Sequence, residues 1–84
     1  MPILEQVKEI LASQLAVKHD AVKPDSKLRD DLGSDSIDAL EIISSIEEQF
    51  KIDVSEEEAT KVKTVADIVD LINQKLREKT QTQG

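Results

Sequence analysis

Residues 33–50 read GSDSIDALEIISSIEEQF and contain a turn, a helix cap and one amphipathic helix. Gly33 permits a sharp turn before it, and Asp35 can cap the helix, with Asp38 at the matching third position. Apolar residues then recur at helical spacing and form an inward stripe that consists of Ala39, Ile42, Ile43, Ile46 and Phe50. The sequence therefore predicts a helix over residues 36–50.

Three other segments have helical patterns. Long helices are predicted over about residues 2–15 and about residues 65–77, because each segment has an apolar face with helical periodicity. A short helix is predicted to begin at Ser55, since Ser55 and Glu58 have the spacing of a capping box. Thr64 is the expected N-cap of the last helix.

A long connection over residues 16–35 joins the first two helices. Pro24 excludes a continuous helix there, and four apolar residues can pin the connection across a bundle, namely Val17, Val22, Leu28 and Leu32. Three long helices, one short helix and no alternation typical of strands predict an all-α four-helix bundle with a long loop between its first two helices. We expect one domain, residues 1–79, followed by a disordered polar tail, residues 80–84.

The chain offers little for metal binding or catalysis. It has no cysteine and a single histidine, so no disulfide or thiolate metal site can form and no metal is expected. An EF-hand built around Gly33 would need carboxylates at Leu28 and Ala39, which excludes a calcium loop of that kind. A catalytic Ser36 would need an adjacent base, and His19 lies far from it in the sequence. We interpret Ser36 as a hydroxyl that another enzyme modifies, although a serine near a helix start is most often only a cap.

Negative charge is concentrated in the middle of the chain. The net charge is −7, and residues 30–60 hold eleven acidic residues against one basic residue, Lys51. Such a field repels nucleic acid and anionic lipid, so neither nucleic acid nor a membrane is an expected partner, whereas basic patches on other proteins are. An acidic face kept for solubility is the alternative. The first residues show no targeting signal and the apolar runs are too short to span a membrane, so a cytoplasmic protein is expected.

The outer side of the helix over residues 36–50 has the composition of a docking face. Its residues off the inward stripe are Ile37, Leu40 and Ser44, and the acids that border them are Asp38, Glu41, Glu47 and Glu48. Small apolar contacts ringed by acids suit a basic groove on a partner protein. In the alternative interpretation, Ile37 and Leu40 only close the end of the bundle.

One run of residues resembles the attachment site of acyl carrier proteins. It is DLGSDSIDALE at residues 31–41, and in that family a Leu-Gly-x-Asp-Ser-Leu pattern holds the serine that receives 4′-phosphopantetheine. The resemblance continues through IEEQF at residues 46–50 and TVAD at residues 64–67, and covers most of the chain. Ile37 stands where the family usually has leucine, a change that could alter partner fit without removing the site. The long first loop is also similar to that of the family.

The resemblance implies an acyl carrier domain over residues 1–79 that transports without catalysis. A phosphopantetheinyl transferase would move 4′-phosphopantetheine from coenzyme A to Ser36, and the thiol of this arm would hold acyl chains as thioesters for delivery to fatty acid synthesis enzymes. Asp35 and Asp38 would position the serine and help to bind the transferase. The successive enzymes would dock through their basic patches on Ile37, Leu40, Glu41, Glu47 and Glu48. The acyl chain would enter a cavity lined by Ile43, Ile46, Ile68 and Ile72. A monomer is the expected state.

Other interpretations stay open at this point. The cargo could be a polyketide intermediate or an activated amino acid, and the sequence discriminates poorly among these classes. The chain could also be an acidic helical adaptor in which Ser36 is never modified. A hydrolase built on Ser36 and His19 is the enzyme alternative.

Overall fold

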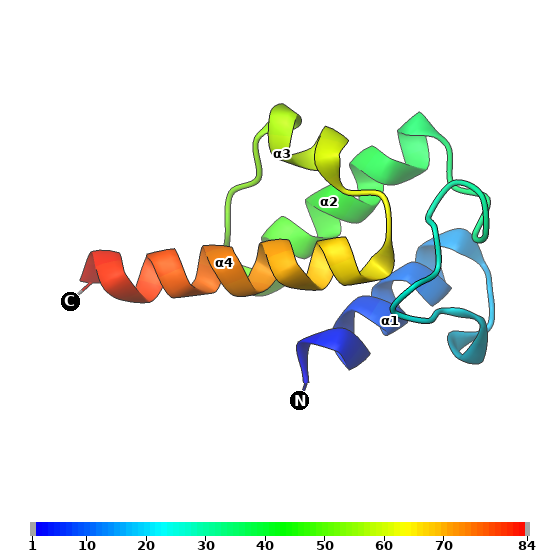
Figure 1. The fold of residues 1–84 in the computed structure, drawn as a ribbon, viewed down its shortest axis with the longest axis horizontal. Helices are drawn as coiled ribbons and strands as arrows, with labels where there is room; N and C mark the ends of the chain where they lie inside the picture. Colours follow the sequence, from blue (N-terminus) through cyan, green and yellow to red (C-terminus); the bar gives the residue numbers. More distant parts are fainter. Residues whose placement is uncertain (1, 84) are drawn as a thin grey trace.

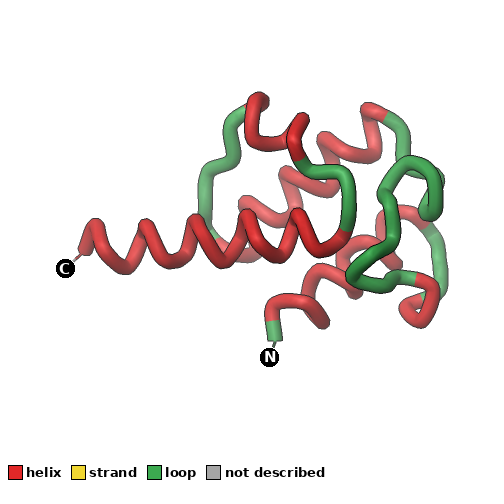
Figure 2. Tube along the Cα trace, in the orientation of Figure 1, coloured by secondary structure: helices red, strands yellow, loops and turns green. Residues whose placement is uncertain are grey.

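The computed structural model describes residues 2–83, and for residues 36 and 79–83 the description covers the backbone alone. Its four α-helices and one short 3-10 helix are, in chain order, α1 (Ile3–Leu15), η1 (His19–Ala21), α2 (Ser36–Phe50), α3 (Glu56–Lys61) and α4 (Val65–Gln83). Figures 1 and 2 show their arrangement, with the long loop after α1 wrapping one end of the molecule. The predicted all-α four-helix fold is confirmed for the described residues. Among these residues no helix is both long enough and apolar enough to cross a membrane.

Helices α2 and α3 begin at the capping boxes that the sequence predicts. At α2, the Asp38 N–H donates to Asp35 Oδ1 at 2.9 Å, and the Asp35 N–H donates to Asp38 Oδ2 at 3.3 Å. At α3, the Glu58 N–H donates to Ser55 Oγ at 3.2 Å, and the Ser55 N–H donates to Glu58 Oε1 at 3.1 Å. Each box satisfies two backbone donors that have no partner inside the helix, which fixes where the helix starts.

The start of α4 is capped in the same reciprocal way. The Asp67 N–H donates to Thr64 Oγ1 at 3.2 Å, which confirms Thr64 as the cap. Asp67 Oδ2 accepts the N–H groups of Lys63 at 3.0 Å and of Thr64 at 3.1 Å. Hydrogen bonds to a carboxylate stabilise its ionised form. The bond from the Lys63 N–H has the largest effect, followed by that from the Thr64 N–H, and together they hold the pKa of Asp67 below its usual range.

We expect Asp67 to titrate at lower pH in the folded chain than in the unfolded chain. Because its folded pKa is depressed below the ordinary value of 3.8, its contribution to stability is present above about pH 3.8 and is lost as the pH falls through the folded pKa. Carbon-detected NMR titration of the Asp67 carboxyl, with the urea-unfolded chain as reference, measures this difference. Identical midpoints in the two states would contradict the capping role.

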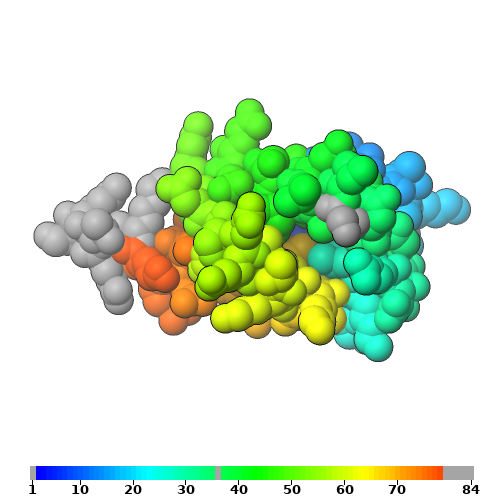
Figure 3. Space-filling model, turned by 90° about the horizontal axis from the view of Figure 1, so that it is seen from above, coloured from blue at the N-terminus to red at the C-terminus, as the bar shows by residue number. Residues whose placement is uncertain are grey.

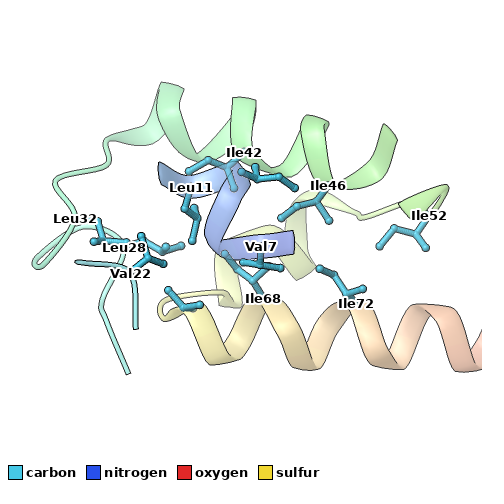
Figure 4. Packing of buried hydrophobic residues seen from close by; sticks show 12 residues of the cluster. Val7, Leu11, Val22, Leu28, Leu32, Ile42, Ile46, Ile52, Ile68 and Ile72 are labelled. Atoms are coloured by element: carbon cyan, nitrogen blue, oxygen red, sulfur yellow. The ribbon is translucent and has the colours of Figure 1, made fainter. Parts of the chain in front are cut away.

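The core lies where α1 meets α2 on one side and α4 on the other (Figure 4). Its most deeply buried side chains, each less than 2% exposed, include Val7, Leu11, Ile42, Ile46, Ile68 and Ile72. All of them come from the apolar stripes that the sequence predicts for these helices. Aliphatic burial of this kind supplies most of the stabilisation of a small domain. Phe50, the single aromatic residue, packs partly buried against the cluster.

The connection between α1 and α2 is pinned to the core and to the start of α4. Val22, Leu28 and Leu32 are buried as the sequence predicts. The backbone carbonyl of Ser26 accepts the Val65 N–H at 3.1 Å, and the carbonyl of Pro24 accepts the Ala66 N–H at 2.8 Å. These two amides belong to the first turn of α4, where helical N–H groups lack intrahelical partners. The connection between α1 and α2 therefore supplies the hydrogen-bond acceptors for the first turn of α4, which lies about 40 residues later in the chain.

Helix α4 is longer than the sequence analysis predicts. The predicted end near Arg77 is wrong, because the helix runs to Gln83 (Figure 1). The chain between these residues contains neither glycine nor proline, and lysine, glutamate and glutamine extend a helix at little cost. Residues 80–83, for which we predict disorder, continue the backbone of this helix. The rest of that predicted tail, Gly84, lies outside the described residues.

Candidate cofactor-attachment site

Ser36 is the first residue of α2, directly after the capping residue Asp35. Gly33 makes the turn that leads into the helix with a φ of 72°, a left-handed conformation that glycine adopts without strain. The turn is closed by backbone hydrogen bonds from the Gly33 N–H to Arg29 O at 3.2 Å and from the Ser34 N–H to Leu28 O at 2.9 Å. The backbone of Ser36 therefore occupies the positive end of the α2 dipole, held by a well-bonded turn.

A groove of about 920 Å³ lies beside this helix start. Asp35, Ala39 and Leu40 line it from α2, and Ala59 and Thr60 line it from α3. In Figure 3 the surface is hollowed between these two helices. Ala39 and Ala59 give it short side chains on both helices, and charged side chains such as Lys27, Arg29 and Glu56 also line it.

The four isoleucines predicted for the acyl cavity do not line this groove. Ile46, Ile68 and Ile72 are at most 1% exposed and pack in the closed core, and Ile43 is 9% exposed (Figure 4 labels three of them). Their role in acyl binding stays a prediction. Sequence reasoning missed Ala59, because an alanine carries no pattern that separates a groove wall from an ordinary helix position.

Two apolar side chains beside Ser36 are exposed to solvent. Ile37 is 67% exposed and Leu40 is 62% exposed, and these are the two large exposed hydrophobic residues among the described side chains. They therefore do not close the end of the bundle, which was the alternative interpretation. Of the predicted acidic border, Glu41 and Glu48 are exposed on the same helix, whereas Asp38 and Glu47 are half-buried. The docking role of these residues stays a prediction.

Glu47 has a structural contact that the sequence analysis missed. Its Oε2 accepts the Val54 N–H at 3.0 Å, and its backbone carbonyl accepts the Ile52 N–H at 3.1 Å. Both bonds hold the loop from α2 to α3 against the end of α2. The side chain is half-buried, so part of its acceptor capacity serves the fold.

His19 lies away from the groove. It belongs to η1, and its Nε2 is 3.3 Å from the Glu5 carboxylate of α1. It is not among the residues that line the groove beside α2. The structure therefore gives no support to a hydrolase built on Ser36 and His19.

Comparison with known proteins agrees with this geometry. The family model described as the phosphopantetheine attachment site matches residues 5–72. An acyl carrier protein of Thermosynechococcus vestitus is 46% identical over 74 residues, which are 88% of this chain and 91% of the relative.

Solved structures of acyl carrier proteins share the fold. The holo acyl carrier protein of Geobacter metallireducens superposes with a TM-score of 0.81 at 27% identity, covering 96% of this chain and 93% of that one. The acyl carrier protein of Enterococcus faecalis gives a TM-score of 0.74 at 32% identity over 86% of this chain and 91% of that one. Together with the family match, these likenesses show that the chain belongs to the acyl carrier proteins, which are carriers rather than enzymes and bear a 4′-phosphopantetheine prosthetic group.

Proposed function

We propose that Ser36 carries the 4′-phosphopantetheine arm and that the chain delivers acyl chains to enzymes of fatty acid synthesis. The observation that supports this most is the position of Ser36 at the first residue of a capped helix beside a groove. When bound, the arm supplies a thiol for thioesters, which a chain without cysteine cannot supply itself. The proposal includes a monomeric carrier in the cytoplasm, the simplest arrangement for a protein that meets several enzymes in turn.

The residues around Ser36 fit a phosphodiester. The N-terminal end of a helix favours a phosphate through its amide groups and dipole. Asp35 and Asp38 would repel a phosphate, but each carboxylate already accepts the backbone N–H of the other residue, which partly offsets its charge. The groove, which Asp35 helps to line, offers space for the arm next to α3.

The proposal is tested by the intact mass of the chain before and after incubation with coenzyme A and a phosphopantetheinyl transferase. A gain of one phosphopantetheine unit is the expected result. No gain in a folded, initially unmodified sample would instead favour the acidic adaptor. Native cargo, read from the mass of the loaded chain isolated from its source, separates fatty acyl groups from polyketide or aminoacyl groups.

We further propose that partners dock on the outer side of α2 through their basic patches. This docking face consists of Asp35, Ile37, Asp38, Leu40, Glu41, Glu47 and Glu48. Its exposed apolar pair and its acids together suit a transient contact, since single exposed ion pairs contribute only about 0.2–1 kcal/mol. The acyl cavity at Ile43, Ile46, Ile68 and Ile72 is also part of the proposal and requires the helices to part around a chain.

Neutralising one acid of the docking face should weaken binding to the transferase. For Glu41→Gln we expect Kd to rise by about 1.4- to 5-fold at low salt, with a smaller difference at high salt because exposed charges are screened. Asp70→Asn is the matched control, since Asp70 is an exposed acid on α4 outside the docking face. Binding that responds equally to both substitutions would contradict docking on α2.

A further inference from the structure

Helix α3 is the least anchored wall of the groove. It spans only Glu56–Lys61 and contains no buried residue, yet Ala59 and Thr60 line the groove. Its backbone approaches that of α2, and the flanking residues Val54 and Val62 are only partly buried. Apolar burial therefore contributes little to the position of this helix, and polar contacts have a larger share than elsewhere in the fold.

Among the described side chains, an ion pair between Glu58 and Lys75 joins α3 to α4. Lys75 Nζ lies 2.8 Å from Glu58 Oε1, and the two side chains are 20% and 29% exposed. The same Glu58 oxygen accepts the Ser55 N–H at 3.1 Å, so a single atom links the start of α3 to α4. The hydrogen bond between them lowers the pKa of Glu58 and raises the pKa of Lys75, so both groups stay charged over the ordinary pH range.

Lys75 extends from a firmly packed part of the molecule. Its helix contributes Ile68 and Ile72 to the core, and α4 packs against α1. In Figure 1, α3 lies across from α4, and the Lys75 side chain reaches from α4 to Glu58 of α3. The charges of Asp53, in the loop before α3, and Glu78 also favour the protonated form of Lys75.

We propose that Lys75 is a positioning residue whose ion pair with Glu58 holds α3 in place as the movable wall of the groove. Loss of the pair lets α3 detach from α4 and unfold locally more often, while the core formed by α1, α2 and α4 stays closed. The side chains of this pair are partly exposed, so we take the range of surface ion pairs, which shift an equilibrium by only about 1.4- to 5-fold. Such a shift is small for the whole fold but appreciable for a helix without buried residues. The effect of this motion on an acyl group held in the groove rests on the proposed function, whereas the motion of α3 itself does not.

Amide hydrogen exchange in the unmodified chain tests the motion. Lys75→Met removes the charge and keeps the aliphatic stem, and Glu58→Gln removes the other charge while glutamine still suits a capping box. Each variant, and the double variant, should speed exchange of the Ala59 and Val62 amides by about 1.4- to 5-fold, because their acceptors Ser55 O and Ala59 O belong to α3 and its cap.

The controls separate a local effect from a global one. Arg77→Met removes an exposed cation of the same helix and should leave exchange in α3 unchanged, while Lys75→Arg should retain most of the protection. Added salt should bring the parent chain toward the variants. A uniform rise that includes the Leu11 amide of the core, additive effects in the double variant, or no change in α3 would each overturn the proposal.

A second measurement uses the chain loaded with a medium-length acyl group. If the α3 wall shelters the thioester, its cleavage by hydroxylamine should be about 1.4- to 5-fold faster in Lys75→Met than in the parent chain or in Arg77→Met. Equal cleavage rates would overturn the effect on the groove even if exchange in α3 had changed. Failure of the parent chain to load would contradict the proposed function and leave the exchange result standing.

Discussion

Replacing Ser36 with alanine should abolish attachment of the phosphopantetheine arm. The nearest serine in the chain, Ser34, is buried and 6% exposed, and its backbone belongs to the turn before the helix. It therefore cannot substitute as an acceptor without opening that turn. The variant should fold normally, because Asp35 rather than Ser36 caps α2 and alanine is the best helix-forming residue.

The matched control for this substitution is Ser44→Ala. Ser44 is exposed on the same helix, so its variant should gain one phosphopantetheine unit as the parent chain does. Intact mass after incubation with coenzyme A and transferase measures the gain, and far-ultraviolet circular dichroism verifies that each variant is helical. Full modification of a folded Ser36→Ala chain would place the attachment site at another residue and contradict the assignment.

Replacing Ile72 with alanine should destabilise the fold more than any substitution on its surface. Ile72 is fully buried where α4 packs on the core, beside Val7 and Ile68 in Figure 4. Removing three carbons from such a site costs about 2–5 kcal/mol through lost burial and the cavity left behind. The whole domain has only about 4–13 kcal/mol of stability if it follows the usual value per residue. The midpoint of thermal unfolding should therefore fall by roughly 10–30 °C.

The same substitution at Ile37 is the control for burial. Ile37 lies on α2 with 67% of its surface exposed, so Ile37→Ala should change the free energy of unfolding by no more than about 0.5 kcal/mol. Urea unfolding of both variants, followed by circular dichroism, gives the two values. Similar losses at the two positions would mean that α4 does not pack on the core as described.

The sequence alone predicted the helix starts and the residues that face inward. A capping box depends on residues three positions apart, so Asp35 with Asp38 and Ser55 with Glu58 can be recognised without any tertiary information. The inward stripes follow from the helical period for the same reason. The end of α4 was missed because that segment contains no residue that stops a helix, and the predicted end rested on where the apolar pattern fades.

Some features of the candidate site could be predicted from the sequence and others could not. Ser36, its cap and its acidic surroundings are contiguous in the chain, so the resemblance to acyl carrier proteins could be seen in the sequence. The sequence could not predict whether Ile37 and Leu40 are exposed, since the periodic pattern allows both an exposed pair and a closed bundle end. Glu47 looked like a surface acid, but the loop from α2 to α3 returns to its carboxylate.

Local order in the chain thus determined where α2, α3 and α4 begin and the sequence motif around Ser36, the serine that we propose is modified, because the forces involved act within one or two helical turns. Tertiary structure alone decided the groove between α2 and α3, the bonds from Pro24 and Ser26 to the start of α4, and the ion pair between Glu58 and Lys75. Each of these joins residues far apart in sequence. These residues come close because the apolar faces of the helices pack together, and the spacing of residues within a single helix does not predict such contacts.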